Sequence, residues 1–450
     1  MLKDRSFRRT VIAITLPLAI NNVMSFGVQM LDTVMVGRLG DSAVAAVSLA
    51  TQPYFIYQVL LYGLVSGGSI LVSQYWGQGD VSHIRRIMAL MLKTVAAVSA
   101  AYALLCAVFP SQIMHIYSQD ESIIGLSVSY LRVVVLSYVL AGLANSYFSA
   151  LQAKEDVRVS TVIYAGSFFV NVIANYILIF GHLGLPAMGV VGAAAGTVIA
   201  RGFECLAAWA YARFREREIG FSHHDIIKKD RDLFPHYLRV SLPVIGDDLV
   251  WSLGSSARVA IIGNIGTVFV TAASVAGIAE QFAMIMVYSV ARTASIMIGK
   301  TIGTGDRSKA KSMGDAFLAL SVLVGVAACG VVLLVRGPLL MLYPDLSADS
   351  RSLAYGLMGT IAAVMLVCGI ETTSIIGVLR GAGDNRFALA MDAGGMWLLS
   401  LPLGLLAAKV LHWPAGLVYV CLRSDSPLKA FICAIRVRKG NYIRDMTKPQ

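Results

Sequence analysis

The sequence predicts an all-α integral membrane protein with twelve transmembrane helices in two similar six-helix bundles. Three observations lead to this prediction: the composition, the apolar runs and an internal repeat. Of the 450 residues, 57% are hydrophobic and 14% are charged, and the mean hydropathy is +0.71. Such a chain would not keep aqueous domains in solution. Twelve spans of roughly 20 residues with short loops use its whole length.

Twelve apolar runs have the length and composition of spanning helices. Their limits are residues 10–36, 43–72, 88–109, 122–150, 159–181, 188–213, 237–262, 271–299, 314–335, 352–379, 386–411 and 415–436. The first run follows a basic segment, as in a signal peptide, but it continues through Leu31 without a cleavage site of small residues. We therefore expect a retained signal anchor.

The distribution of basic residues predicts the orientation. With an even number of spans the loops alternate between two sides, and nearly all loop lysines and arginines fall on the side of the termini. The other side holds only Arg38, Arg336, Arg351 and Lys409. The positive-inside rule then places both termini in the cytoplasm of a multi-pass inner-membrane protein. It also explains the net charge of +11 without a nucleic-acid partner.

The chain repeats itself. The segment that starts at Pro17 matches the segment that starts at Pro243, an offset of 226 residues, and the turn GQGD at 77–80 matches GTGD at 303–306. Later, LQAKEDVR at 151–158 matches LRGAGDNR at 379–386, an offset of 228. We expect Pro17 and Pro243 to let the first helix of each half bend.

The repeat predicts two lobes, residues 1–213 and 237–450, joined by a solvated polar linker at 214–236. Because each half has six helices, both halves enter the membrane in the same direction. Such parallel repeats are related by an axis along the membrane normal, as in transporters that rock two lobes around a central cavity.

Five segments resemble the multidrug and toxic compound extrusion (MATE) transporters. They are LDTVMVGRLG at 31–40, SQYWGQGD at 73–80, NVIANYILIFG at 171–181, MGVVGAAAGTVIAR at 188–201 and LRGAGD at 379–384. The resemblance implies a V-shaped, two-lobed antiporter, and we expect a monomer that is not an enzyme. It would export organic cations or amphipathic drugs by alternating access in exchange for Na⁺ or H⁺, with no cofactor besides that ion.

Asp32 is the first candidate for ion coupling. A carboxylate inside a span is costly and therefore marks function, although an acid at the outer helix end is the alternative. Asn171 and Asn175 share one helix face, and their amide oxygens, with the Thr197 hydroxyl, could help to bind Na⁺. The resemblance implies that these four positions line the ion site. Some members carry Asp at the position of Asn175, and packing amides are the alternative here.

The second half carries different charges. Arg258 stands 226 residues after Asp32, so the second lobe has a base where the first has an acid. We expect ion coupling in the first lobe, and pairing or substrate recognition in the second. The candidates for the substrate cavity are Asp247, Asp248, Arg258, Glu280 and Glu371.

Two of these acids leave alternatives open. Glu280 has no base within one helical turn, so it is either unpaired or bound to another helix. Some MATE transporters carry an acid shortly before the L-R-G motif, but that register falls on Gly369, two residues from Glu371.

Two pairs have helical spacing. Arg201 with Glu204 (i, i+3) and Asp425 with Lys429 (i, i+4) predict structural ion pairs. The pairs Gly63 with Gly67 and Gly192 with Gly196 predict close helix packing.

Two other functions remain as alternatives. A lipid-linked oligosaccharide flippase shares the two-lobed design but would need a strongly cationic cavity, and acids accompany several of the bases in these spans. A membrane-embedded enzyme would need a nucleophile or a motif such as H-E-x-x-H within a span, and the sequence contains none.

Overall fold

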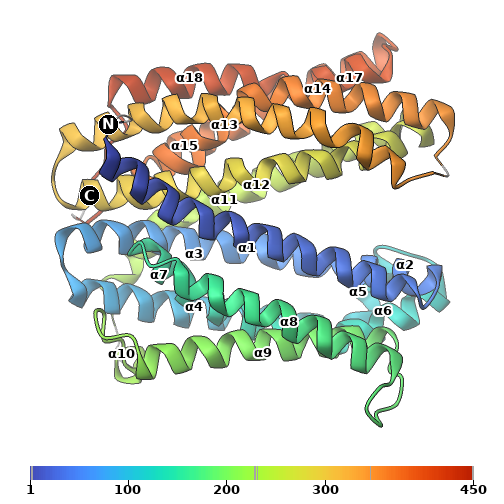
Figure 1. The fold of residues 1–450 in the computed structure, drawn as a ribbon, viewed down its shortest axis with the longest axis horizontal. Helices are drawn as coiled ribbons and strands as arrows, with labels where there is room; N and C mark the ends of the chain where they lie inside the picture. The colour runs from blue at the N-terminus through green and yellow to red at the C-terminus, as the bar shows by residue number, and fades with distance from the viewer. Residues whose placement is uncertain (2–3, 228–229, 231, 345, 448–450) are drawn as a thin grey trace. The chain divides into compact units, whose positions relative to one another are not determined.

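The computed structural model describes residues 1, 4–227, 230, 232–344 and 346–447, and its regular elements are helices (Figure 1). The first half contains α1 (Arg5–Gly37), α2 (Asp41–Ala50), α3 (Gln52–Gln78), α4 (Val81–Val108), α5 (Pro110–His115), α6 (Glu121–Val134), α7 (Leu136–Ala153), α8 (Arg158–Phe180) and α9 (Val190–Phe214). The rest contains α10 (His223–Ile227), α11 (Phe234–Gly263), α12 (Thr267–Gly303), α13 (Arg307–Met341), α14 (Ala348–Thr372), α15 (Asn385–Ala393), α16 (Leu401–Leu405), α17 (Ala415–Cys421) and α18 (Asp425–Lys439). Three π-helical segments, η1 (Thr373–Leu379), η2 (Gly394–Ser400) and η3 (Leu406–Val410), continue α14, α15 and α16.

The spanning helices confirm the predicted fold class. Within the described ranges, nine helical stretches are long and apolar enough to cross a membrane, and α6 with α7, bent by 44°, makes a tenth. The remaining two predicted spans correspond to α11 and to α17 with α18. Both carry charged residues, Asp247 in α11 and Lys429 in α18, that are buried inside the protein.

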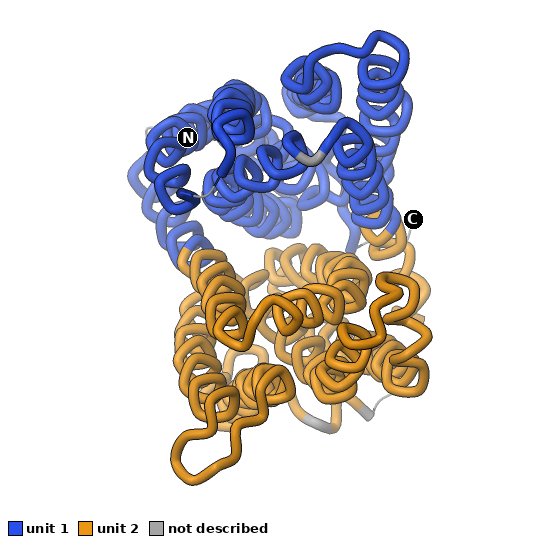
Figure 2. Tube along the Cα trace, turned by 90° about the vertical axis from the view of Figure 1, so that its right-hand side faces the viewer, with its two compact units in different colours: residues 1–19, 246–450 blue, residues 20–245 orange. Residues whose placement is uncertain are grey.

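The chain folds into two compact units whose boundaries differ from the predicted lobe boundaries. One unit comprises residues 1–19 and 246–450, and the other comprises residues 20–245 (Figure 2). The boundaries fall two residues after Pro17 and Pro243, which lie inside α1 and α11. The predicted boundary was the linker at 214–236 instead. The first part of α1 therefore belongs to the unit of the second half, and the first part of α11 to the unit of the first half.

Apolar side chains explain why the first part of α1 belongs to the unit of residues 246–450. Four of them are buried and recur every three or four residues, which is one face of a helix: Phe7, Val11, Ile14 and Leu18. The ring of Phe7 packs edge-on against Phe317 of α13, with 5.5 Å between ring centroids. The hydroxyls of Thr15 and Thr293 of α12 form a hydrogen bond of 2.9 Å.

The first part of α11 packs closely against α3. Tyr237 is fully buried and donates its hydroxyl to the carbonyl oxygen of Leu64 at 3.0 Å. A Cβ atom on Gly67 would lie 2.6 Å from Cα of Ser241. This small-residue position therefore serves helix packing.

We expect Gly67→Ala to destabilise the protein by about 1–3 kcal/mol, because the added methyl group would overlap the backbone of α11. The measurement is thermal unfolding in detergent micelles. Gly125→Ala on α6 is the control, because nothing lies within 4 Å of its Cβ position. Equal melting temperatures for Gly67→Ala and wild type would contradict the close packing.

Part of the linker is buried, so the expectation of a solvated linker is wrong there. Glu216 and Ile219 are buried. The Lys154 ammonium, in the turn after α7, lies 3.1 Å from Glu216 and 2.8 Å from Glu218. Glu216 also accepts the backbone N–H groups of Ile219 and Gly220, each at 2.9 Å. A buried lysine needs such partners, and they fix the linker to the unit of residues 20–245.

These contacts predict a pH dependence of stability. Burial alone would raise the pKa of Glu216, but the two backbone N–H groups and Lys154 outweigh it, and the pKa is lowered. A lowered folded-state pKa gives stability that is present above the unfolded pKa of about 4.3 and is lost as the pH falls through the folded value. We expect Glu216→Gln to cost about 2 kcal/mol at pH 7 and less at pH 4.

Melting temperatures measured at both pH values test this expectation. Glu121→Gln, at a carboxylate whose side chain is 81% exposed, is the control. A loss for Glu216→Gln that is the same at pH 7 and pH 4 would show that its charge does not stabilise the linker.

Candidate functional site

Asp32 of α1 lies beside two asparagines of α8. Asn171 and Asn175 share one helix face because they are four residues apart, and both are buried, with 3% and 0% of their surface exposed. Asn175 donates from Nδ2 to Oδ1 of Asp32 at 2.5 Å, and Oδ1 of Asn171 lies 3.4 Å from the same nitrogen. The structure brings these three residues together and leaves Asp32 partly exposed.

One oxygen of this cluster is unpaired. Oδ1 of Asn175 is buried and lacks a hydrogen-bond partner in the described part of the chain. It points at Gly196 of α9, where a Cβ atom would overlap it. An unpaired buried carbonyl oxygen is costly, and carboxylate and amide oxygens suit hard cations. The cluster could hold a small cation, or Asp32 could take up a proton.

The hydroxyl of Thr197 of α9, which was predicted to help to bind Na⁺, forms a hydrogen bond within its own helix. It donates to the carbonyl oxygen of Ala193 one turn earlier, at 3.1 Å. Tyr130 of α6 lies beside Thr197 and within electrostatic range of Asp32. The structure thus places Thr197 next to the Asp32 cluster and adds Tyr130, which the sequence analysis missed.

Arg201 and Glu204 form an ion pair on α9. Nη1 of Arg201 lies 2.8 Å and 2.9 Å from the two carboxylate oxygens of Glu204, and the Ser167 hydroxyl donates to Glu204 at 2.7 Å. Arg201 also attracts Asp32 electrostatically. Its ion pair in the described structure is nevertheless with Glu204, which leaves Asp32 with the asparagine amide.

Lys429 of α18 is the centre of a charged cluster in the unit of residues 246–450. Its ammonium binds three carboxylates: Glu371 of α14, Asp392 of α15 at 2.8 Å and Asp425 at 3.0 Å. Lys429 is 3% exposed and Asp425 is 1% exposed. The spacing of Asp425 and Lys429 predicted their contact, whereas Glu371 and Asp392 come from other helices.

Arg258 of α11 binds the same cluster. Its Nη2 donates to Oδ1 of Asp425 at 2.8 Å and to the Ser400 hydroxyl at 3.1 Å. The base that stands in the repeat position of Asp32 is therefore neutralised by an acid, whereas Asp32 meets an amide.

A second buried group surrounds Arg380. Its guanidinium donates to Oδ2 of Asp247 at 2.6 Å and 3.0 Å, and to Oδ1 of Asp248 at 2.9 Å. Asp247 is fully buried. These two acids of α11 thus neutralise one arginine, which limits their freedom to bind a substrate.

Glu280 of α12 has its partner on another helix. Nη2 of Arg423 donates to both carboxylate oxygens of Glu280, at 2.5 Å and 2.7 Å. The Tyr419 hydroxyl lies 3.3 Å from the same carboxylate. Of the two alternatives for Glu280, the structure shows the paired one.

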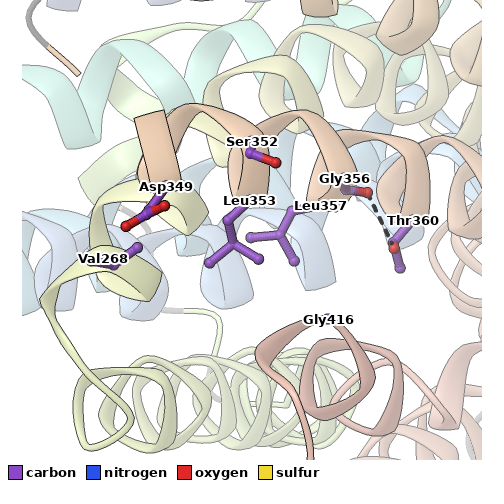
Figure 3. Close-up of a pocket in the computed structure, with 8 residues that line it drawn as sticks. All are labelled: Val268, Asp349, Ser352, Leu353, Gly356, Leu357, Thr360 and Gly416. Atoms are coloured by element: carbon purple, nitrogen blue, oxygen red, sulfur yellow. Dashed lines mark hydrogen bonds between the residues drawn. The ribbon is translucent and has the colours of Figure 1, made fainter. Parts of the chain in front are cut away.

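The charged clusters do not line the detected cavities. A cavity of about 510 Å³ lies beside the first turns of α14 and is lined by residues such as Asp349 and Leu353. Figure 3 shows these residues, with Gly416 of α17 facing them. A second cavity, of about 870 Å³, lies between α11 and the segment 397–413. The described lining of neither cavity includes a predicted site residue. In the same described ranges, no group of three His, Cys, Asp or Glu residues is arranged to hold a metal ion.

A family model decides the identity. The MatE model matches residues 17–177 and again residues 243–406, so most of the chain is covered. The chain belongs to the MATE family. The two matches begin at Pro17 and Pro243, the residues at which the internal repeat begins.

Curated relatives of this MATE protein extend over most of the chain. The probable multidrug resistance protein NorM of Agrobacterium fabrum is 29% identical over 91% of this chain and 88% of its own length. The multidrug resistance protein NorM of Burkholderia vietnamiensis is 26% identical over 90% of both chains. The uncharacterized transporter YisQ of Bacillus subtilis is 22% identical over 98% of this chain and 96% of its own. The chain is a membrane transporter, not an enzyme.

Solved structures agree with the MATE fold. A crystal structure of the Vibrio cholerae MATE transporter VcmN matches with a TM-score of 0.88 at 16% identity and covers 98% of this chain and 99% of that chain. A MOP superfamily transporter from Pyrococcus furiosus matches with a TM-score of 0.87 at 15% identity and covers 98% and 96%. At this level of identity the likeness concerns the fold alone.

Within this MATE chain, sequence reasoning missed two charged residues. Asp392 lies in a predicted span, and the rule that ionisable residues in spans are functional candidates would have found it. Arg380 was counted as a loop base because it directly follows the tenth predicted span, yet it is 7% exposed. Its place at the start of the R-G-A-G-D turn offered no signal of burial.

Proposed function

We propose that the protein exports organic cations or amphipathic drugs and takes up Na⁺ or H⁺ in exchange. The relatives named as multidrug resistance proteins support this class of cargo. The observation that carries the proposal is the Asp32 cluster: a partly exposed carboxylate beside a buried, unpaired amide oxygen. An acid in that setting can bind a monovalent cation or a proton and lose it again.

The contrast between the two units supports ion coupling at Asp32. Each candidate acid or base of the second half has an ion partner within its own unit, and Asp32 has an amide. A group held in an ion pair has less to gain from a mobile ion than an acid whose hydrogen-bond partner is an amide. The roles that remain for these second-half residues are pairing and contact with the cargo.

Alternating access requires that ion and cargo prefer different conformations. We propose that α1 and α11 bend near Pro17 and Pro243 during this exchange, since a proline removes a helical hydrogen bond and permits a kink. The division of both helices between two units, two residues beyond each proline, supports a hinge there.

The flippase alternative has less support. Binding of a pyrophosphate needs uncompensated positive charge, but five buried or half-buried bases of the described structure are engaged by carboxylates, and the other two bases within predicted spans, Arg132 and Arg292, are exposed. The five engaged bases are Arg201, Arg258, Arg380, Arg423 and Lys429.

We further propose that the protein acts as a monomer in the inner membrane, with both termini in the cytoplasm and no cofactor besides the coupling ion. The excess of basic loop residues on the side of the termini supports this orientation.

Efflux of ethidium from reconstituted vesicles, with Na⁺ and proton gradients imposed separately, tests the proposal. We expect efflux to depend on one of the two gradients and to stop when that gradient is collapsed by an ionophore. Ethidium movement that is the same with and without either gradient would contradict coupling. Competition by a lipid-linked pyrophosphate, without ethidium transport, would favour the flippase.

A further inference from the structure

Three buried or half-buried carboxylates surround the ammonium group of Lys429. An ammonium group has three N–H donors, and each of the three carboxylates around Nζ comes from a different position: Glu371, Asp392 and Asp425. Three helices, α14, α15 and α18, supply these groups (Figure 1). One of these contacts, with Oδ1 of Asp392, is also a hydrogen bond, whereas Oδ2 of Asp425 lacks a hydrogen-bond partner in the described part of the chain.

The backbone also makes room for this lysine. A Cβ atom on Gly395 would lie 2.9 Å from Cδ and 3.0 Å from Cγ of Lys429. Gly395 lies in the π-helical segment η2, directly after α15. Segments of this kind are rare and are frequently found at functional sites. The stem of Lys429 thus occupies a place that a larger residue at 395 would close.

Acids outnumber bases in this interior. Lys429 and Arg258 face three carboxylates, and the neighbouring Arg380 faces Asp247 and Asp248. Removal of the Lys429 charge would leave its three carboxylates with only the partial compensation of Arg258 at Asp425 and of the more distant Arg380 and Arg423. Uncompensated buried charge is strongly unfavourable, so such a site would take up another cation.

We propose that Lys429 is a tethered cation that fills a carboxylate site in the unit of residues 246–450 and keeps Na⁺ out of it. The presence of Lys429 makes this unit unable to bind a mobile ion, and this part of the inference stands independently of Asp32. One consequence rests on the proposed function: ion coupling is then confined to the Asp32 cluster.

Lys429→Gln tests the proposal in a chain that also carries Asp32→Asn, which removes any contribution of the first cluster. Thermal unfolding is measured in detergent with NaCl or with choline chloride at the same ionic strength. We expect Na⁺ to stabilise the double variant but not the Asp32→Asn parent. At a Na⁺ concentration 100 times its Kd, the ratio of folded to unfolded protein should rise about 100-fold. Binding of ²²Na⁺ gives a second, independent readout.

Arg423→Gln in the same Asp32→Asn background is the matched control. It removes one half-buried base of the same unit but uncovers a single ion-paired carboxylate, Glu280, rather than three. We expect at most a tenth of the Na⁺ affinity of the Lys429→Gln variant. Equal Na⁺ stabilisation in both would overturn the proposal, because any uncovered acid would then suffice.

A further variant keeps the test decisive if Lys429→Gln folds poorly. Adding Asp392→Asn removes one of the three acids, so this variant should fold more readily and bind Na⁺ at least tenfold more weakly than Lys429→Gln. Rescue of Lys429→Gln by purification in NaCl, but not in choline chloride, would support the proposal. The absence of any selective effect of Na⁺ in all these variants, or Na⁺ binding by the Asp32→Asn parent at the three carboxylates, would overturn it.

Discussion

Asp32→Asn should abolish efflux driven by an ion gradient. At an effective dielectric constant near 20, two unit charges 4 Å apart interact by about 4 kcal/mol, which corresponds to roughly a thousandfold in ion affinity. The substituted amide also carries no exchangeable proton in the physiological range. Both possible coupling ions would therefore lose their site, while the helix fold should persist because Asn can keep a hydrogen bond with Asn175.

The measurement is ethidium efflux from vesicles under an imposed Na⁺ or proton gradient, together with ethidium binding to the purified variant. Asp41→Asn is the control, since Asp41 is an exposed acid at the start of α2. We expect the control to transport like wild type. If Asp32→Asn retained gradient-driven efflux, the coupling ion would have to bind elsewhere, whatever the outcome for Lys429.

Arg380→Met should strongly destabilise the protein. It would leave two acids, Asp247 and Asp248, without the guanidinium that now neutralises both. Removal of one partner from a buried ion pair costs about 3–5 kcal/mol, because the remaining charge stays buried and unpaired. Asp247 has no exposed surface from which water could compensate it.

Thermal unfolding in detergent measures this loss. Arg386→Met is the control, because Arg386 lies in the same turn motif but is exposed. Adding Asp247→Asn to Arg380→Met should restore part of the stability, since it removes one uncompensated charge. A melting temperature for Arg380→Met equal to that of Arg386→Met would contradict the importance of this group.

The sequence allowed the fold and the shared helix face of Asn171 and Asn175 to be predicted. Apolar runs and the repeat were enough for the helical membrane class, because lipid exposure demands long apolar segments whatever their partners. Asn171 and Asn175 could be placed on one face by spacing alone. Their approach to Asp32 followed only from the family resemblance, since periodicity describes a helix face and not the neighbour that it meets.

The partners in the second half could not be predicted for the same reason. Glu280 meets Arg423 across 143 residues, and Arg380 meets Asp247 across 133. Spacing rules apply within one helix, so they yielded only the contact of Asp425 with Lys429. The π-helical segment η1 also begins two residues after Glu371. An α-helical repeat counted back from the L-R-G motif therefore does not give the helix face on which Glu371 lies.

The bend between α6 and α7 had no sequence signal. It occurs at Val135, where neither proline nor glycine interrupts the apolar run. The sequence also did not predict that α1 and α11 are each divided between the two units, because an apolar helix face can pack against any apolar surface.

That division has a consequence for how the chain could have arisen by duplication. Residues 1–19 complete the interior of the later unit, and residues 234–245 belong to the earlier one. An ancestral protein with a single half would then have had a complete interior only as a dimer whose two molecules exchanged their N-terminal segments. Modern halves cut apart at residue 222 should likewise fail to fold singly and recover when they are produced together.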